Sequence, residues 1–412
     1  MEAGVLGNAG GPCVVERRVL QPVRLDDGFV RQRAVHDVDT TGENVQACRR
    51  MTTFARAISA LLVCLGVLAS STGAAATSSM SARVETDTTK IAFIRSGDIY
   101  VMNGDGKAQK RLTRYPLSYL DEVAWSPDGR KIAFVKSGEA LAKTGSNAQP
   151  GNVYLVNVDG SRMRRVTRQR SFDLSDLSWS PGGGSLAYTH RAPGPEGTPH
   201  LFVTAVARRA ERGLMPQLIV TAPDWSPDGR RIGIVVDLGG VPGSAAISTV
   251  SPDGTHLRRL TLVRNGGGSN TTWSPDGKTL LFLAGGCNSS SCFTEIRSIS
   301  AAGGNARRLA RLKTTYRLAP LWSPDGQRIV FVRNDDIWTM NTDGNQQRRV
   351  SSGPELDGSP SWSPDGTQIA FERYRSRGEN YSIYVVKEDG SGLRRLTRGP
   401  FDGSPSWQPT RP

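Results

Sequence analysis

One pentapeptide, Trp-Ser-Pro-Asp-Gly, recurs along the chain and constrains the fold more than any other feature. Exact copies begin at Trp125, Trp225, Trp273, Trp322 and Trp362, and degenerate copies begin at Trp179 and Trp407. These tryptophans are separated by 54, 46, 48, 49, 40 and 45 residues. A period of about 40 to 50 residues is typical of a β-propeller, in which each repeat forms one four-stranded blade.

Each repeat carries the signals of four antiparallel strands. Ser-Pro-Asp-Gly is a turn, because proline presets φ, aspartate bonds its own backbone and glycine accepts a positive φ. In the first full repeat, apolar strands follow the turn at residues 131–135 and 152–156. A tight Asp159-Gly160 turn then leads to a fourth strand that begins with a basic pair, Arg164 and Arg165.

The repeat count predicts how the ring closes. Second strands begin at Ile91, Ile132, Leu186, Ile232, Leu280, Ile329 and Ile369. The first of them has no tryptophan strand before it, and Trp407 has no second strand after it. We therefore predict an all-β, seven-bladed propeller over residues 90–412, in which the C-terminal strand at 404–407 pairs beside Ile91 and removes the open sheet edges. Six blades plus extra strands are the alternative. One buried tryptophan per blade is expected to pack between neighbouring sheets.

The segment before the repeats has the pattern of an export signal. Arg49, Arg50 and Arg56 lie next to a 13-residue apolar run at 57–69, which is followed by small residues up to Ala76. We predict a secretory signal over 51–76, cleaved near Ala74–Ala76, with a linker at 77–89. Residues 1–50 are expected to be a disordered upstream extension before a true start at Met51. The protein is then periplasmic or extracellular, and an uncleaved signal that anchors it in a membrane is the alternative.

The positions of cysteine and histidine limit which disulfide bonds and metal sites the chain can form. Beyond the signal only Cys287 and Cys292 remain, and in an oxidising compartment they are expected to form a loop disulfide. The chain has four histidines, of which His190 and His200 flank one connection, and none forms a helical metal-binding pair. No cofactor, metal site or catalytic residue is predicted.

Basic residues exceed acidic ones by 14, and basic pairs recur in the fourth strands. Two interpretations are open: exposed charges that prevent edge-to-edge pairing, or a positive rim that contacts an anionic surface. Nucleic acid is not an expected partner, because no module that combines aromatic and basic residues is present.

Acidic residues gather before the inner strands, on the face where the longer connections at 136–151, 191–198, 285–294 and 373–381 also lie. The predicted partner-binding residues are Asp121, Glu122, Asp173, Asp176, Asp224, Glu355, Asp357 and Asp402. The alternative is that Asp357 and Asp402 only serve the turn chemistry of Asp-Gly-Ser-Pro.

The pattern W-S-P-D-G-[RK]-x-I-A-F followed by D-[IG]-Y-x-[VM]-N-x-D-G resembles the TolB-type propeller repeat over residues 90–412. In that family TolB binds the peptidoglycan-associated lipoprotein in the periplasm. The resemblance implies a monomeric, non-enzymatic propeller that binds a protein or peptide, such as an envelope lipoprotein. Similar repeats cap peptidases, but no Gly-x-Ser-x-Gly elbow occurs here. Similar repeats also form polysaccharide lyases, so a carbohydrate-binding or lyase-type propeller is the alternative function.

Overall fold

The computed structural model describes residues 89–114, 120–137, 150–167, 171–191, 197–239, 244–264, 267–287, 292–312, 318–375 and 380–410, together with two strands before residue 40. The chain divides into two units, Met1–Ala82 and Arg83–Pro412. In the first unit, β1 (Arg18–Arg24) pairs antiparallel with β2 (Val30–His36). These strands lie in the segment for which the sequence predicted no regular structure. The predicted signal and linker lie outside the described residues. No helix in the described part of the chain is long and apolar enough to cross a membrane.

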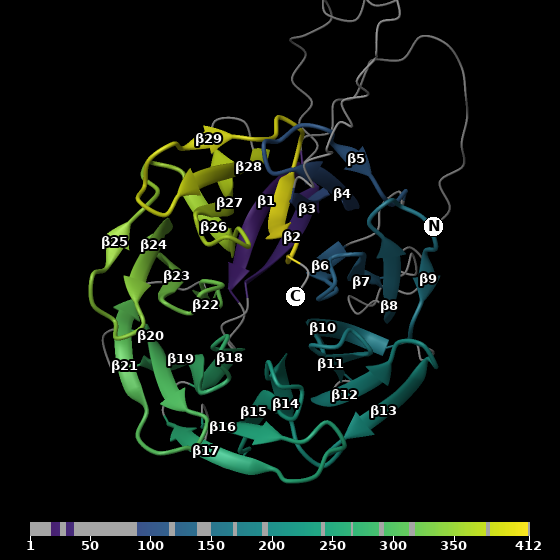
Figure 1. Cartoon of the computed structure of the whole chain (residues 1–412), viewed down its shortest axis with the longest axis vertical. Helices are drawn as coiled ribbons and strands as arrows, with labels where there is room; N and C mark the ends of the chain where they lie inside the picture. Colours follow the sequence, from purple (N-terminus) through teal and green to yellow (C-terminus); the bar gives the residue numbers. More distant parts are fainter. Residues whose placement is uncertain are drawn as a thin grey trace, which may run out of the picture. The chain divides into compact units, whose positions relative to one another are not determined.

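The second unit is a ring of seven blades, each of four antiparallel strands (Figure 1). Blade 1 consists of β30 (Asp402–Trp407), β3 (Lys90–Arg95), β4 (Asp98–Asn103) and β5 (Lys110–Arg111); blade 2 of β6 (Leu120–Trp125), β7 (Lys131–Ser137), β8 (Pro150–Asn157) and β9 (Arg164–Arg165); and blade 3 of β10 (Ser171–Trp179), β11 (Ser185–Arg191), β12 (Pro199–Ala205) and β13 (Ala210–Leu214). Blade 4 consists of β14 (Val220–Trp225), β15 (Ile232–Asp237), β16 (Ala245–Val250) and β17 (Arg258–Val263), and blade 5 of β18 (Gly268–Trp273), β19 (Thr279–Cys287), β20 (Cys292–Ser300) and β21 (Arg307–Leu312). Blade 6 consists of β22 (Leu321–Trp322), β23 (Arg328–Arg333), β24 (Asp336–Asn341) and β25 (Arg348–Arg349), and blade 7 of β26 (Leu356–Trp362), β27 (Gln368–Arg375), β28 (Asn380–Lys387) and β29 (Arg394–Arg395).

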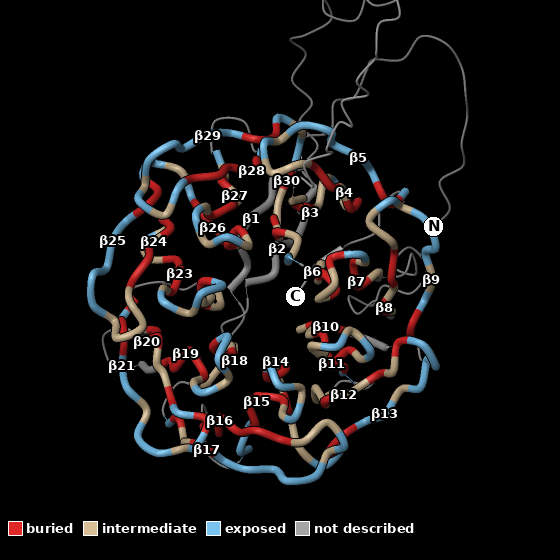
Figure 2. Tube along the Cα trace, in the orientation of Figure 1, coloured by how far each residue is buried: buried red, intermediate tan, exposed pale blue. Residues whose placement is uncertain are grey.

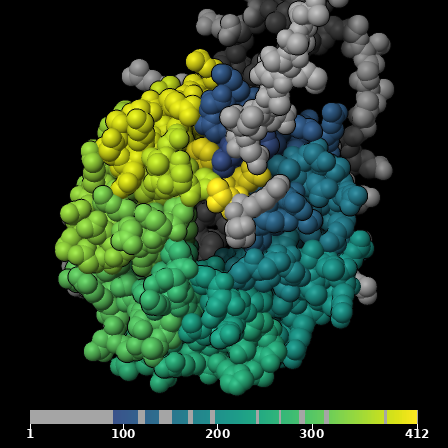
Figure 3. Space-filling model, in the orientation of Figure 1, coloured from purple at the N-terminus to yellow at the C-terminus, as the bar shows by residue number. Residues whose placement is uncertain are grey.

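The first strand of each blade lies toward the centre of the ring, and the fourth lies at the rim (Figure 1). The blades follow one another in chain order around the space-filling view (Figure 3). Blades 2 and 3 are also joined, because β10 pairs with β8 through Ser171 and Phe172.

The C-terminal strand closes the ring, as the repeat count predicted. In blade 1, β30 pairs antiparallel with β3, with Trp407 opposite Ile91 and Asp402 opposite Arg95. The first blade therefore combines residues from both ends of the propeller sequence, and the alternative of six blades plus extra strands is not observed.

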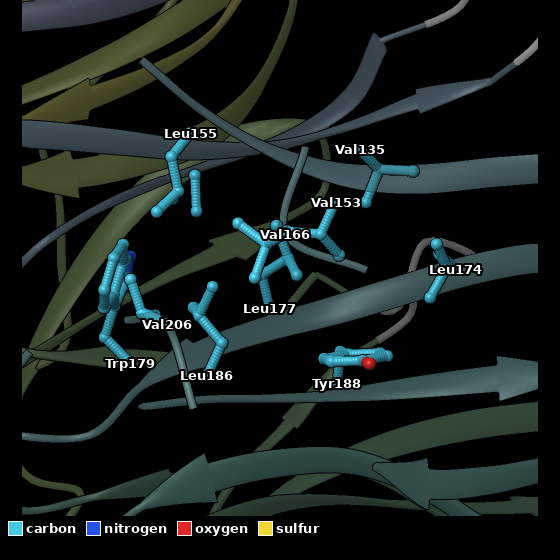
Figure 4. Close-up of a cluster of buried hydrophobic side chains, with 11 residues drawn as sticks. Val135, Val153, Leu155, Val166, Leu174, Leu177, Trp179, Leu186, Tyr188 and Val206 are labelled. Carbon is cyan, nitrogen blue, oxygen red and sulfur yellow. The ribbon is translucent and has the colours of Figure 1, made fainter. Parts of the chain in front are cut away.

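The core lies between neighbouring blades. In one of its clusters, Val153 and Leu155 of blade 2 pack with Leu186 and Tyr188 of blade 3 (Figure 4). The middle strands are buried, whereas the rim is largely exposed (Figure 2). A single blade cannot bury its own two faces. Apolar side chains therefore pack one blade against the next.

Each repeat tryptophan contributes to this packing. Five of the seven also form a hydrogen bond between blades. The indole N–H groups of Trp125, Trp179, Trp273, Trp322 and Trp362 donate to Ser406, Ala124, Asp224, Thr272 and Leu321 carbonyls at 2.9–3.3 Å. The acceptor is in each case the residue before the tryptophan of the preceding blade. This regularity explains why tryptophan occupies the position: the ring fills the gap while the N–H satisfies an inner-strand carbonyl. The indole nitrogens of Trp225 and Trp407 are the exceptions, being buried without a partner.

Candidate partner-binding face

The ring has two chemically different faces. Ser-Pro-Asp-Gly turns and the connections between third and fourth strands lie on one side, which we call the turn face. Connections between second and third strands, and those that lead into the inner strands, lie on the other, which we call the loop face. The inner strands begin at the loop face, so the predicted acidic residues at their beginnings lie there.

Asp402 lies at the start of β30 and is completely buried. Arg95 donates from Nε to its Oδ1 at 2.5 Å and from Nη2 to its Oδ2 at 3.0 Å. The hydrogen bond that Arg95 donates to Asp402 raises the pKa of Arg95 above its usual value. The backbone N–H of Gly399 also donates to Oδ2, at 3.0 Å. Asp402 therefore folds the chain that enters blade 1 into a turn and does not present a free carboxylate.

Asp357 has the same role in blade 7. Arg373 donates to its two carboxylate oxygens at 2.6 and 2.7 Å, and both side chains are almost fully buried. Arg373 also donates to the Ser352 carbonyl at 3.3 Å, which ties the entering loop to the pair. The guanidinium lies over the rings of Phe371 and Tyr384. A bidentate arginine pair held in this way fixes geometry strongly.

The remaining predicted acids, apart from Asp224, fall into three groups. Asp176 has a positive φ at a bulge of β10 and accepts from Thr189 Oγ1 at 2.9 Å and from the Ala222 N–H of the next blade at 3.3 Å. Glu355 lies 3.6 Å from Arg375, and both are partly exposed. The backbones of Asp121, Glu122 and Asp173 lie in β6 and β10, but their side chains are outside the described residues.

Asp224 is not at the loop face, which corrects the sequence-based placement. It immediately precedes Trp225, near the end of β14, and lines a cavity together with the Ser-Pro turns. Its position relative to the tryptophan differs from that of Asp357 and Asp402, which lie five residues before theirs. Sequence reasoning grouped these acids because it ignored this difference along the strand.

Sequence reasoning missed two exposed apolar side chains directly before the buried acids. Leu356 precedes Asp357 and is 42% exposed, and Phe401 precedes Asp402 and is 51% exposed. Phe401 has a φ of 55°, a left-handed conformation that is unusual for a bulky residue. The turn is held from the neighbouring strand connection, where the Ser96 N–H donates to the Phe401 carbonyl at 3.3 Å and Ser96 Oγ to the Pro400 carbonyl at 3.1 Å. The sequence does contain a signal for these two side chains, namely the repeated pair of an apolar residue and an aspartate at Leu356-Asp357 and Phe401-Asp402.

Glu372 joins the two entering strands. Its carboxylate accepts from Ser359 Oγ of β26 at 2.9 Å and from the Ser404 N–H of β30 at 2.8 Å. A Cβ at Gly403 would lie 2.8 Å from Glu372 Oε2, so a larger residue there would displace this carboxylate. Blades 7 and 1 thus share one polar framework beneath Leu356 and Phe401.

The basic pairs of the outer strands mainly link blades. Lys110, Arg164, Arg258 and Arg394 each donate to a turn carbonyl of the following blade, at 2.5–3.1 Å. The second residues of some pairs act within their own blade, as Arg111 and Arg349 do with Asp98 and Asp336. This is a third role, which neither sequence-based interpretation included.

Within the described ring, the histidines and cysteines do not form a metal site. Among the described residues, no group of three or more His, Cys, Asp or Glu side chains is arranged to hold a metal ion. His190 and His200 are cross-strand neighbours, but His190 is buried against Phe202 and His200 bonds the Leu218 carbonyl. Cys287 and Cys292 are opposite each other at the end of the β19–β20 ladder, and the disulfide remains a prediction.

Comparison with known proteins agrees with the repeat architecture. The family model described as the TolB beta propeller domain matches residues 141–411. The chain belongs to this family. Two curated relatives of the TolB beta propeller are the Tol-Pal system protein TolB of Desulfosudis oleivorans, 29% identical over 37% of this chain and 32% of that protein, and the protein TolB homolog of Chlorobium luteolum, 30% identical over 38% and 33%. The chain therefore aligns with about a third of the length of these relatives.

Among solved structures, an oligogalacturonate lyase in complex with manganese is similar with a TM-score of 0.56. The match covers 70% of this chain and 82% of the lyase at 15% identity, which shows a common fold and nothing about activity.

Proposed function

We propose that this TolB-like propeller is an exported, non-enzymatic protein that binds a protein or peptide partner in the cell envelope through its loop face. The observation that carries the proposal is Phe401, a large aromatic side chain held half-exposed in a left-handed backbone conformation. Strained residues persist only where the surroundings hold them, and they concentrate at binding sites. Aromatic residues, phenylalanine included, are also enriched at the centres of protein interfaces.

The polar framework supports this assignment of roles. Asp402, bound by Arg95 and Gly399, fixes the turn that presents Phe401. Asp357, bound by Arg373, does the same for Leu356. In this proposal Phe401 and Leu356 contact the partner, Glu355 supplies charge beside them, and the buried aspartates position the contacts.

The family relationship supports the class of partner. The Desulfosudis relative is named as a component of a protein system, so an envelope protein such as a lipoprotein is the partner class we expect. The signal pattern at 51–76 supports the proposal of export.

The test is affinity capture from envelope extract with the wild type, Leu356→Ala/Phe401→Ala and Leu393→Ala. Leu393 is the matched control, because it is 41% exposed but lies beside the basic pair of β29. We expect the double variant to lose a specific partner while its melting temperature stays within about 2 °C of the wild type. Equal capture by all three proteins would contradict the proposed face.

A further inference from the structure

A cavity of about 400 Å³ lies on the turn face, away from Leu356 and Phe401. Its walls include Pro275, Pro324 and Pro364 of three Ser-Pro turns and four of the repeat tryptophans. Asp224 of blade 4 supplies the one carboxylate of this lining. A concave, mostly apolar surface with a few fixed polar groups is the usual form of a binding pocket.

Asp224 is half-buried, and it differs from the buried carboxylates of the described ring in having no basic partner. Asp98, Asp336, Asp357, Asp402 and Glu295 each form an ion pair with arginine. The carboxylate of Asp224 instead accepts from the backbone N–H of Trp273 at 2.8 Å and from Ser178 Oγ at 3.3 Å. Arg231, the arginine over the Trp273 ring, donates to the Ala301 carbonyl. A half-buried charge without a counter-charge is costly, and a cation in the cavity would remove that cost.

A second group in the same wall also lacks a partner. The indole nitrogen of Trp407 is buried and has no acceptor, although five equivalent tryptophans donate to a carbonyl. The cavity wall therefore contains an uncompensated acceptor, Asp224, and a tryptophan whose buried donor is unused. A peptide supplies the complement of the carboxylate, because it carries basic side chains.

We propose that the turn-face cavity binds an arginine side chain of a peptide segment, with the guanidinium paired to Asp224. A metal ion fits poorly, because one carboxylate among indoles and prolines offers too few oxygen ligands. Arginine suits both parts of the wall, since its planar group pairs with a carboxylate and stacks on aromatic rings. The inference goes beyond the proposed function, because it assigns a second binding site on the opposite face.

The experiment uses two peptides, acetyl-Pro-Arg-Pro-amide and the same peptide with citrulline, which is neutral and nearly isosteric with arginine. Binding is measured by calorimetry and by the indole N–H signals of the tryptophans. Asp224→Asn removes the charge but keeps an acceptor for the Trp273 N–H. Asp253→Asn, at an exposed turn of the same blade, is the matched control for net charge. All measurements are repeated with Arg411→Gln, which removes the arginine that follows Thr410 of the cavity lining in the sequence.

We expect the arginine peptide to bind, and both citrulline and Asp224→Asn to weaken binding at least about tenfold, while Asp253→Asn has no effect. Tighter binding in Arg411→Gln would also support the site, because it shows the cavity accepting arginine from the chain itself. Equal affinity for the two peptides would overturn the proposal, as would absence of binding at millimolar peptide with and without Arg411. None of these results depends on Leu356 or Phe401, so failure here is distinguishable from failure of the loop-face proposal.

Discussion

Arg95 binds both carboxylate oxygens of Asp402, one residue after the exposed Phe401. The two partners are separated by 307 residues in the sequence, and ring closure brings them together. The same contact therefore closes the propeller and shapes the turn that we propose to bind a partner.

The left-handed backbone at Phe401 gives a prediction about strain. Phe401→Gly should be more stable than Phe401→Ala by about 1 kcal/mol, because glycine adopts a positive φ without steric cost. Chemical denaturation of both variants measures the difference. If alanine proves equal to or better than glycine, the turn is not strained as described.

The buried pair of Asp357 and Arg373 predicts an asymmetric response to mutation. Asp357→Ala leaves a buried guanidinium without its partner and should cost about 3 to 5 kcal/mol in free energy of unfolding. Replacing both residues, as Asp357→Leu/Arg373→Met, should cost distinctly less. A double variant less stable than Asp357→Ala would argue against this explanation.

The closing strand makes the last residues essential for the ring. A chain that ends at residue 402 loses most of β30, including Trp407 opposite Ile91, and should melt at least about 10 °C lower. A chain that ends at Thr410 keeps the strand and serves as the control. An unchanged melting temperature after the longer deletion would refute closure by β30.

Asp224 predicts a pH dependence of stability. Burial raises its pKa to about 6, and the hydrogen bonds from Trp273 and Ser178 oppose this only in part. A carboxyl whose pKa is higher in the folded than in the unfolded state favours folding below the unfolded value, near 4, and this contribution is lost as the pH rises through about 6. Asp224→Asn should therefore raise the melting temperature at pH 7 by about 2 °C or more and flatten the decline between pH 4 and 7. If the melting temperatures of the wild type and the variant changed in parallel between pH 4 and 7, the raised pKa of Asp224 would be contradicted.

The β19–β20 register gives the cysteine prediction a geometric basis. Cys287 and Cys292 are directly opposite each other, the arrangement in which cross-strand Cβ atoms are closest. Under oxidising conditions we expect an intact mass lower by about 2 Da than after reduction, and a stabilisation of about 2 kcal/mol for so short a loop. Two free thiols in protein purified without reductant would exclude the bond.

The sequence predicted the fold well, because the tryptophan period and the turn chemistry are local and repeat in every blade. The ring closure followed from one unmatched strand at each end. The site was predicted less well, since the acidic residues near Trp225 and Trp362 were grouped together although they lie one and five residues before their tryptophans and so at different depths of their strands. Nor does the sequence show that Arg95 and Arg373 neutralise Asp402 and Asp357, because these pairs depend on tertiary register. The exposed side chains of Leu356 and Phe401, beside these aspartates, indicate the candidate binding surface better than the aspartates do.

The most direct test of partner binding is photo-crosslinking in the cell. A benzoylphenylalanine replaces Phe401 in one version of the protein and the control residue Leu393 in another. We predict that the residue at 401 crosslinks to one specific envelope protein and that the residue at 393 does not. Crosslinks that are absent at 401, or identical at both positions, would contradict the loop face as the binding surface.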